Sequence, residues 1–242
     1  MTEFEKSEWK DIKHVHEFVE NADNYILERN RQFKILGSFY NHYLQKKSDK
    51  TSLKVLDLGS GSGKVTAEIL KIDGNAELFL VDGSTEMLET AKSHLKYAKN
   101  IHFIKKTFQD LIKTDNFPFN FDLIVSSLAI HPLSTDEKDS LFKFIYDRLV
   151  DGGFFINMEV ILPLSESLEE WYLILWQDWI QENEIKLGLE ESFQNIPIKY
   201  KNNPDNHPDT LEYQLDALKR IGFKNVDCHY KYGIFSMYGG EK

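Results

Sequence analysis

Three glycines at alternate positions follow a short apolar stretch that is typical of a buried strand. The expected strand covers residues 53–58, and the glycines after it are Gly59, Gly61 and Gly63. Glycine permits a turn too tight for a side chain and lets a ligand approach the backbone closely. A helical pattern begins directly afterwards, and the first turn of a helix offers unpaired N–H groups and a positive dipole end. The stretch therefore predicts a ligand site between a strand and a helix.

Asp57, two residues before the first glycine, helps to decide between two classes of ligand. A dinucleotide fingerprint has the spacing G-x-G-x-x-G, but here Lys64 occupies the place of the last glycine. A carboxylate at the end of the strand would repel a pyrophosphate and attract an ammonium group. The charge argument predicts a ligand with an amino-acid head and disfavours an oxidoreductase that binds a nicotinamide cofactor.

A family resemblance covers this stretch and the strand after it. Residues 57–63 resemble the first motif of class I S-adenosylmethionine-dependent methyltransferases. The expected second strand, residues 77–81, ends in Asp82, about 20 residues beyond the glycines, where an acidic side chain can hold both ribose hydroxyls. The residues that follow resemble the family's entry to its second helix: Gly83, Ser84, Thr85, Glu86, Met87 and Leu88. The resemblance implies S-adenosyl-L-methionine as cofactor and S-adenosyl-L-homocysteine as its product.

The resemblance also implies roles for individual residues. The three glycines would allow close approach to the backbone, Asp57 would hold the methionine amino group, and Asp82 would hold the ribose. At the adenine edge the family usually has an acidic residue followed by a small one, whereas this chain has Thr107 and Phe108 there. Asp110 is then the expected acceptor for the adenine amino group. The remaining residues expected at the cofactor are Gly83, Ser84, Met87, Ser126 and Leu128.

His131 is the candidate general base. Methyl transfer from a sulfonium is an in-line displacement on an activated carbon, so the protein chiefly aligns donor and acceptor and excludes water. A base adds rate when the acceptor is a poor nucleophile. His131 follows the expected fourth strand, which begins at Phe121 and resembles the family motif that lines the methyl-transfer site. The alternative is a histidine that only shapes the loop with Pro132.

Composition narrows the classes of protein further. The chain has 242 residues, a formal net charge of −10 and 41% hydrophobic residues, enough for one core with a cap. No basic block is present, which disfavours a nucleic-acid partner. A negative net charge is still compatible with a local basic patch. The single cysteine, Cys228, excludes an internal disulfide. Neither a signal peptide nor a membrane-spanning run is expected. His14 and His16 lie two residues apart on an expected helix and so on different faces of it, and no metal site is predicted there. These features predict a cytoplasmic protein.

Alternating strand and helix patterns predict an α/β fold with a Rossmann-like, doubly wound sheet. Two β-prone runs at residues 225–230 and 232–238 complete the seven strands of the methyltransferase fold. We divide the chain into an N-terminal helical cap, residues 1–50, and an S-adenosylmethionine-binding domain, residues 51–242. Other helices are expected near residues 64–71, 85–99, 134–150 and 210–221, and other strands near residues 101–105 and 154–158.

A helical insertion at about residues 160–210 interrupts the alternation. Ser167 and Glu170 can cap a helix whose apolar residues lie on nearly all sides, so we expect it to be buried on more than one side. Core or dimer packing is one role for this helix, and an acceptor pocket is the other. Residues 196–210 contain three prolines and are expected to form an irregular loop. In the resembling family, N-terminal segments often close over the ligand, which implies a contact from Tyr25 or Arg31; a packing or solvated role for these residues is the alternative.

The sequence as a whole predicts methyl transfer to a small-molecule acceptor. Residues 216–223 and 230–235 are also similar to the carboxy-S-adenosylmethionine synthase-like branch, which is linked to tRNA wobble-uridine modification. Synthases of that branch place an arginine before the last helix to pair with an extra carboxylate. Residues 199–201 supply lysines here, which lack the bidentate fork of arginine. A synthase that uses prephenate, a non-catalytic S-adenosylmethionine-binding protein and a homodimer stay open as alternatives.

Overall fold

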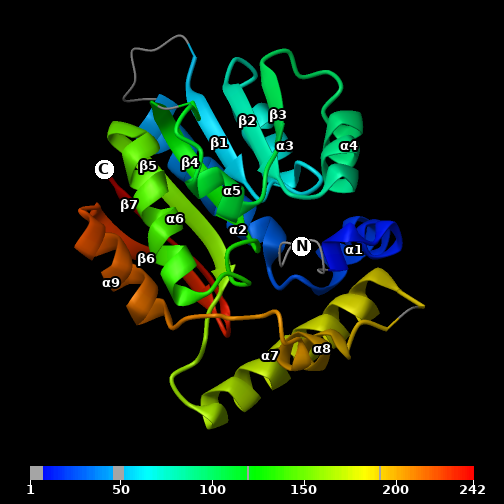
Figure 1. Cartoon of the computed structure of the whole chain (residues 1–242). Coiled ribbons are helices and arrows are strands. Elements are labelled where there is room, and N and C mark those ends of the chain that lie inside the picture. The colour runs from blue at the N-terminus through cyan, green and yellow to red at the C-terminus, as the bar shows by residue number, and fades with distance from the viewer. Residues whose placement is uncertain (1–7, 46–51, 119, 191) are drawn as a thin grey trace.

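A seven-stranded mixed sheet forms the centre of the computed structural model, which describes residues 8–45, 52–118, 120–190 and 192–242 (Figure 1). The strand order is β3-β2-β1-β4-β5-β7-β6. Strands β1 to β5 run parallel, and β7 is antiparallel to both of its neighbours. The strands are β1 Lys54–Leu58, β2 Glu77–Asp82, β3 Ile101–Lys105, β4 Phe121–Ser127, β5 Leu149–Val160, β6 Lys224–Tyr232 and β7 Phe235–Glu241. This topology confirms the expected Rossmann-like methyltransferase fold.

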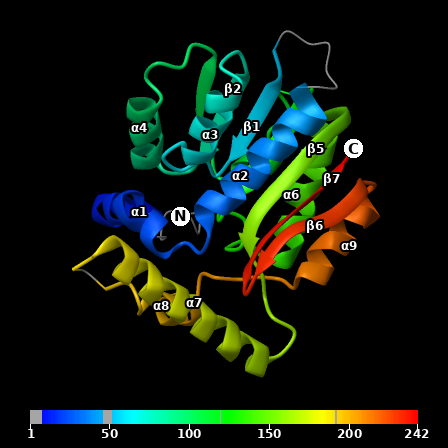
Figure 2. The same ribbon diagram turned by 180° about the vertical axis from the view of Figure 1, so that it is seen from behind.

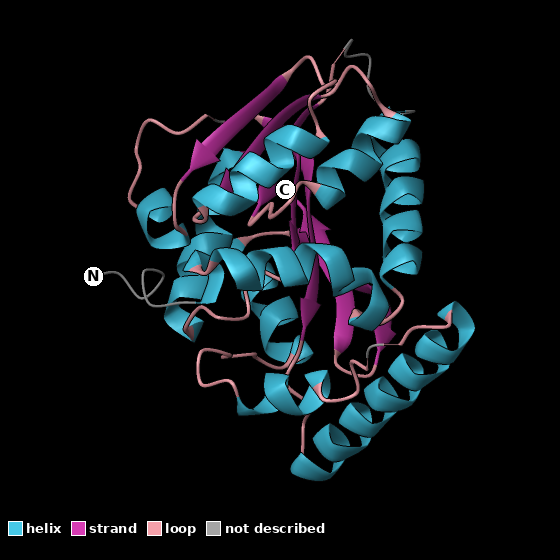
Figure 3. Ribbon diagram, turned by 90° about the vertical axis from the view of Figure 1, so that its right-hand side faces the viewer, coloured by secondary structure: helices cyan, strands magenta, loops and turns pink. Residues whose placement is uncertain are grey.

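Helices cover both faces of the sheet, which Figure 3 shows nearly edge-on. In Figure 1, α5, α6 and α9 lie on the near face, and in Figure 2, α2 and α3 lie in front. The helices are α1 Ile12–Tyr25, α2 Arg29–Phe39, α3 Lys64–Ile72, α4 Thr85–His94, α5 Phe108–Ile112, α6 Thr135–Arg148, α7 Glu166–Leu187, α8 Ile196–Asn202 and α9 Leu211–Ile221. A 3₁₀ turn, Glu8–Lys10, precedes α1, and α2 continues as a π-helix, Tyr40–Gln45.

Alternation along the strands builds one core on each face. On β1, Leu56 and Leu58 belong to the cluster under α5, α6 and α9, whereas Val55 belongs to the cluster under α2, α3 and α4. Near-continuous burial along β4 follows, because both of its faces are covered. The two cores hold the sheet rigidly, so its carboxyl edge can support a site.

A third cluster joins α1, α7 and α8 beyond the carboxyl ends of the parallel strands (Figures 1 and 2). Trp176 and Ile180 of α7 are buried there, but Trp171 and Ile174 are more than half exposed. The expectation that this helix is buried on more than one side is therefore wrong for the described residues. One face of α7 packs on the protein and the opposite face stays in solvent.

Several expected boundaries require correction. The cap of α7 is Ser165, whose hydroxyl accepts a hydrogen bond from Leu168 N, and not Ser167. Residues 196–210 are not all irregular, because Pro197 lies in the first turn of α8, where its missing N–H costs nothing. Helix α5 was not expected from the sequence, and the helix expected near residues 85–99 ends at His94. The helices expected near residues 134–150 and 210–221 are confirmed as α6, which begins with a capping box of Ser134 and Glu137, and α9, which ends at Gly222.

Among the helices of the described ranges, none has the length and apolar character that a membrane crossing requires. Residues 46–51, at the end of the expected N-terminal helical cap, lie outside the described residues.

Candidate functional site

The glycine turn after β1 is held by the end of β2. The N–H groups of Gly59 and Ser60 donate to the carbonyl of Val81 at 2.8 and 3.0 Å. Gly59 has φ +65°, and a Cβ there would lie 2.2 Å from the Cβ of Ala129. A side chain would therefore be both strained and obstructed. The turn requires glycine at this position for packing reasons, before any ligand is considered.

Asp82 organises the same turn from the other side. Its carboxylate accepts hydrogen bonds from Gly61 N and Ser84 N, both at 2.8 Å. Burial raises the pKa of Asp82, although the N–H groups of Ser84, Gly61 and Gly83 act in the opposite direction. Each carboxylate oxygen can accept more than one hydrogen bond, so hydroxyl donors of a ligand can still bind. Asp82 thus links the glycine turn to the start of α4 and can still accept hydrogen bonds from a ligand.

Asp57 carries an unused hydrogen-bond acceptor inside the protein. It is only 1% exposed, and its Oδ2 accepts from the Thr66 hydroxyl at 2.7 Å. Its Oδ1 is buried without a partner among the described residues. Burial raises the pKa of Asp57 to about 7, against the lowering effect of the Thr66 hydrogen bonds. An unpaired buried acceptor destabilises the protein, and an ammonium group would supply the missing donor.

The helix that follows β2 forms the next part of the cradle. Ser84 is fully buried, and its hydroxyl caps α4 by accepting from Met87 N at 3.3 Å. Met87 Sδ would lie 3.8 Å from a Cβ on Gly61, and no other atom of the described residues lies within 4 Å of that position. The glycine turn is therefore bordered by a polarisable side chain and is otherwise open at Gly61.

The residues expected at the adenine edge form the start of α5. Thr107 caps this helix by accepting from Asp110 N at 3.2 Å, and its hydroxyl donates to Asp110 Oδ2 at 2.9 Å. The Phe108 ring reaches to 3.3 Å from the position of a Cβ on Gly59. Phe108 thus borders the glycine turn, Thr107 caps α5, and one oxygen of Asp110 is already engaged.

Ser126 and Leu128 occupy the end of β4 in different ways. The Ser126 hydroxyl is fully buried and donates to the Leu58 carbonyl at 2.9 Å, so it links two strands. Leu128 has φ +52°, a conformation that costs a non-glycine residue about 1–2 kcal/mol. Its N–H donates to the Met158 carbonyl at 2.8 Å. The strained turn directs the chain from the sheet towards His131.

His131 is paired with Glu159, a buried carboxylate whose role was not predicted from the sequence. Its Nδ1 lies 2.8 Å from Glu159 Oε1 at the end of β5, and Glu159 is 1% exposed. The other oxygen of Glu159 accepts from Ile130 N and His131 N at 2.8 and 3.1 Å, and Oε1 also accepts from Val160 N. The signal in the sequence was an acidic residue that ends an apolar strand, as Asp57 and Asp82 do.

The environment of Glu159 keeps it ionised. Burial alone would raise the pKa of Glu159, but His131 and the N–H groups of Val160 and Ile130 outweigh it and lower that pKa. A carboxylate at Nδ1 favours the tautomer that carries its proton on Nδ1 and leaves Nε2 free to accept one. The His131 side chain is 16% exposed. The pair can therefore accept a proton at the carboxyl edge of the sheet.

Aromatic residues of the insertion face this pair. The ring centroids of Tyr200 and His131 lie 6.3 Å apart, and those of Tyr200 and Trp176 lie 5.8 Å apart. The Tyr200 hydroxyl is buried without a hydrogen-bond partner among the described residues, and burial raises its pKa. Tyr25 packs on Phe193 of the same cluster, whereas Arg31 is exposed. Over the described ranges, no group of three or more His, Cys, Asp or Glu residues could hold a metal ion.

The sequence of this chain is similar to those of known methyltransferases and related synthases. Residues 55–153 match the family model described as a methyltransferase domain. A carboxy-S-adenosyl-L-methionine synthase of Nautilia profundicola is 23% identical over 190 residues, covering 76% of this chain and 75% of that protein. A ubiquinone/menaquinone biosynthesis C-methyltransferase of Vibrio campbellii is 25% identical over 195 residues, covering 78% and 71%.

Solved structures share the fold at low sequence identity. PigF, solved with S-adenosylhomocysteine, has a TM-score of 0.65 and 19% identity and covers 97% of this chain. Human N-acetylserotonin methyltransferase, solved with S-adenosylmethionine, has a TM-score of 0.64 and 16% identity and covers 100% of it. The chain spans 60% and 59% of the length of these two proteins. The domain match and the strand order support a class I S-adenosylmethionine-dependent methyltransferase, and the solved structures show that the chain has the methyltransferase fold.

Proposed function

We propose that this methyltransferase acts on a small-molecule acceptor from which His131 removes a proton. The observation that carries the proposal is the contact of 2.8 Å between His131 Nδ1 and the buried Glu159. Glu159 also accepts from the N–H groups of Ile130 and His131, so the same carboxylate orients the ring and the loop that carries it. The acceptor would be an alcohol, phenol or amine that is a poor nucleophile in its protonated form.

The cofactor would lie across the glycine turn, where the residues present fit its parts. Asp57 Oδ1 would accept from the methionine ammonium, Asp82 would accept from the ribose hydroxyls, and Met87 would border the nucleoside. When bound, S-adenosylmethionine supplies a methyl group that is activated by its sulfonium. The unpartnered Oδ1 of Asp57 and the open position beside Gly61 support this placement.

His131 would accept the acceptor's proton at Nε2 while Glu159 holds the proton on Nδ1. Glu159 would stabilise the imidazolium and fix the ring, as the carboxylate of a catalytic triad does. Tyr200 and Trp176 would exclude water and orient the acceptor, since a buried hydroxyl without a partner can donate to a ligand. A base in this position adds roughly 10²–10⁴ to the rate.

The division of the chain follows from these roles. We treat residues 1–50 as a helical cap and residues 51–242 as the S-adenosylmethionine-binding domain, with a cap or lid insertion at about residues 160–210. Side chains of α7 support this division by donating hydrogen bonds to Asn24 O, Tyr25 O and Glu28. A cytoplasmic location and a homodimer stay predictions from the sequence.

The test compares His131→Gln with His102→Gln. His102 on the edge strand β3 also contacts a carboxylate, Glu77 of β2 at 3.2 Å, but these two side chains are 50% and 41% exposed, which makes His102 a matched control. S-adenosylmethionine with a tritiated methyl group is incubated with a small-molecule extract of cells and, separately, with tRNA. We expect label in small molecules, a loss of about 100-fold or more in H131Q, and no loss in H102Q.

Binding of S-adenosylhomocysteine separates catalysis from folding in the same experiment. Isothermal titration should give H131Q an affinity within about threefold of the unsubstituted protein, because His131 is not placed at the cofactor. An undiminished transfer rate in H131Q would refute its role as base. Label in tRNA alone would refute a small-molecule acceptor.

A second candidate is carboxy-S-adenosylmethionine synthesis, because several curated relatives at 23–26% identity carry that name. Against it, α8 offers Lys199, which is exposed, and Lys201, which is paired with Glu169 at 3.0 Å. Neither lysine provides a bidentate partner for an added carboxylate. Mass spectrometry after incubation with S-adenosylmethionine and prephenate decides between the two. A carboxylated cofactor as the product would replace the first proposal by the second.

A further inference from the structure

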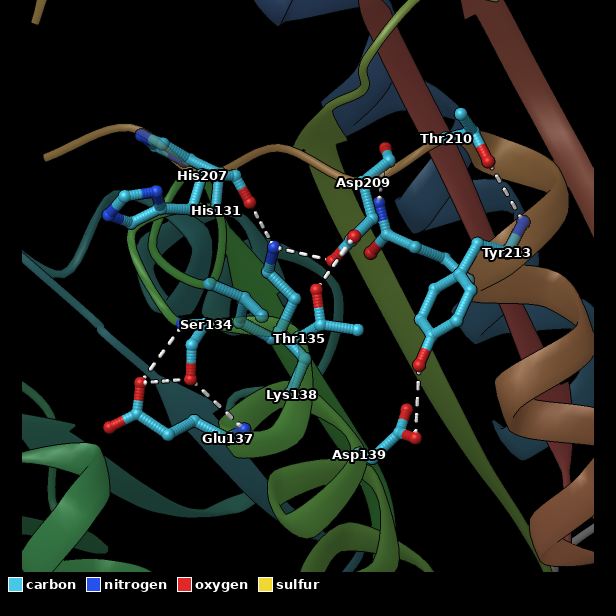
Figure 4. Close-up of polar contacts among 12 residues, drawn as sticks. His131, Ser134, Thr135, Glu137, Lys138, Asp139, His207, Asp209, Thr210 and Tyr213 are labelled. Atoms are coloured by element: carbon cyan, nitrogen blue, oxygen red, sulfur yellow. Dashed lines mark hydrogen bonds and ion pairs between the residues drawn. The ribbon is translucent and has the colours of Figure 1, made fainter. Parts of the chain in front are cut away.

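A buried lysine lies next to the candidate base, on the first turn of α6. Lys138 is 1% exposed, and its ammonium group donates to the His207 carbonyl and to Asp209 Oδ2, the latter at 2.8 Å (Figure 4). Withdrawing an ammonium from water costs several kcal/mol unless partners replace the water. An apolar residue would fill the same space at lower cost, so the charge calls for an explanation.

The residue held by Lys138 also holds His131. While the carbonyl of His207 accepts from Lys138, its N–H donates to the His131 carbonyl at 3.0 Å. One residue of the segment that leaves the insertion therefore bridges the lysine and the loop of the base. The loop is held from the opposite side by Glu159, which binds the ring and two N–H groups.

Asp209 fixes the same segment to three other elements. Its Oδ1 accepts from the Thr135 hydroxyl at 3.0 Å, and its carbonyl accepts from Leu162 N at 3.0 Å and Gln214 Nε2 at 3.3 Å. Leu162 lies where the chain enters the insertion, so both ends of the insertion meet at Asp209. Between them, α8 carries Tyr200 to the face of His131.

We infer that Lys138 is a positioning residue, which fixes His131 on the sheet and Tyr200 on the insertion relative to each other. The inference rests on the proposed role of His131 as base. His207 links the two residues, because its carbonyl accepts from Lys138 and its N–H donates to the His131 carbonyl. The ion pair of Lys138 with Asp209 holds the same segment. Neighbouring acids do not compete for it, because Glu137 is bound to Ser134 and Asp139 to Tyr213 (Figure 4).

The variants are chosen so that the protein still folds. K138M alone removes the cation that pairs with the partly buried Asp209 carboxylate, and this loss can unfold the chain. The double variant K138M/D209N removes both charges, and the amide oxygen of the new asparagine side chain still accepts from Thr135. K143M is the matched control, because Lys143 lies on the same helix and forms an exposed ion pair with Asp147. Isothermal titration with S-adenosylhomocysteine verifies that each variant is folded.

The decisive measurement is the ring signature of His131. Two-bond ¹H–¹⁵N correlation spectra of histidine-labelled protein report the tautomer of each ring, and H131Q identifies the signals of His131. We expect the Nδ1–H signal of His131 to shift or broaden in K138M/D209N and to stay unchanged in K143M. Superimposable His131 signals in the double variant would overturn the inference, since a merely stabilising ion pair would leave the ring in place.

Turnover provides the second readout. With the acceptor fraction labelled by the unsubstituted enzyme, kcat should fall about 10- to 100-fold in K138M/D209N, because small displacements of a catalytic group have effects of that size. The dissociation constant for S-adenosylhomocysteine should change by less than about twofold, which is a small change in binding free energy. If H131Q keeps full activity while the ring signature still depends on Lys138, the proposed base is wrong and the positioning contact stands. If H131Q loses activity but the ring signature does not depend on Lys138, the base stands and only the positioning contact is rejected.

Discussion

The glycine turn and the helical insertion both border the site, but different kinds of contact build them. In the turn, backbone N–H groups of Gly59, Ser60 and Gly61 bind the end of the neighbouring strand. In the insertion, indole and amide side chains of α7 bind the end of α1 and the turn after it, 151 to 159 residues away in sequence. The first region is fixed by the sheet itself. The second depends on side chains that meet only after the chain has folded.

This difference predicts where the molecule is rigid and where it can open. The turn lies on strands that are buried on both faces, so it can open only when the sheet unfolds. The layer of α1, α7 and α8 has one exposed side and is held by a few hydrogen bonds, so it can open at lower cost. Substitutions in the two regions should therefore differ in size and in kind.

The largest effect should come from Gly59→Val. The substitution places a branched side chain at φ +65° and a Cβ 2.2 Å from Ala129, so strain and overlap add. We expect a loss of about 4 kcal/mol or more in the free energy of unfolding, measured by urea denaturation. Gly74→Ala is the control, since no described atom lies within 4 Å of a Cβ there, and its change should be below about 0.5 kcal/mol. Equal stability of the two variants would show that the turn relaxes easily.

The next effect concerns pH and Asp57. Burial raises the pKa of Asp57 to about 7, and an ammonium ligand requires the ionised form. The affinity for S-adenosylhomocysteine should therefore fall about tenfold from pH 8 to pH 6, because the ionised fraction falls by that ratio. Isothermal titration in two buffers of different ionisation enthalpy should also detect proton release at pH 6. Asp57→Asn should bind more weakly and lose this dependence.

The same group affects the stability of the ligand-free protein in the opposite sense. Its folded pKa lies above the unfolded value of 3.8, so the folded state binds the proton more tightly. The stabilising contribution is complete below pH 3.8 and is lost as the pH rises through about 7. In Asp57→Asn this part of the pH profile should disappear, and an unchanged profile would mean that another group titrates.

The contrast between the regions also explains what sequence reasoning could establish. The glycine turn and Asp82 could be placed, because their partners lie at fixed spacing along consecutive strand ends. Glu159 could not be linked to His131, since the two are 28 residues apart and the exact end of β5 decides which acidic side chain faces the loop. The strand end was expected at Met158, one residue before the partner of the base.

The insertion shows a second limit. Three prolines in residues 196–210 suggested an irregular loop, but Pro197 occupies a helix start, where proline is well accommodated. Apolar residues around α7 suggested burial on several sides, yet its exposed face keeps Trp171 and Ile174 in solvent. Composition alone cannot tell which side of such a helix packs, because the packing partner comes from α1, far away in the sequence.

A smaller effect should follow from Trp176→Phe in the insertion. The indole of Trp176 donates to the Tyr25 carbonyl at 2.6 Å, and phenylalanine keeps most of the packing but removes the donor. We expect a loss of about 1–2 kcal/mol, for a buried carbonyl left without its donor. Hydrogen exchange should increase in α1 and not in β1 or β4. Trp171→Phe, at an exposed position, should change neither quantity.

The smallest effect should come from Lys64, which joins the glycine turn to α1, the helix on which the insertion packs. Its ammonium lies 2.7 Å from Asp23 Oδ2 of α1, directly after the glycine turn, and the two side chains are 39% and 41% exposed. Exposed pairs contribute less than about 1 kcal/mol and weaken with salt, so Lys64→Met should have a small effect that vanishes near about 1 M NaCl.

A double-mutant cycle with Asp23→Asn measures this coupling directly. Burial raises the pKa of Asp23, but Lys64 and Arg29 outweigh it and lower that pKa below 3.8. The pair's contribution should therefore be present at neutral pH and be lost as the pH falls below about 4. A coupling energy above about 2 kcal/mol that salt does not reduce would mean that the pair is shielded from water. The cap would then be fixed on the glycine turn as firmly as the turn is fixed on the sheet, and the contrast between the two regions would not hold.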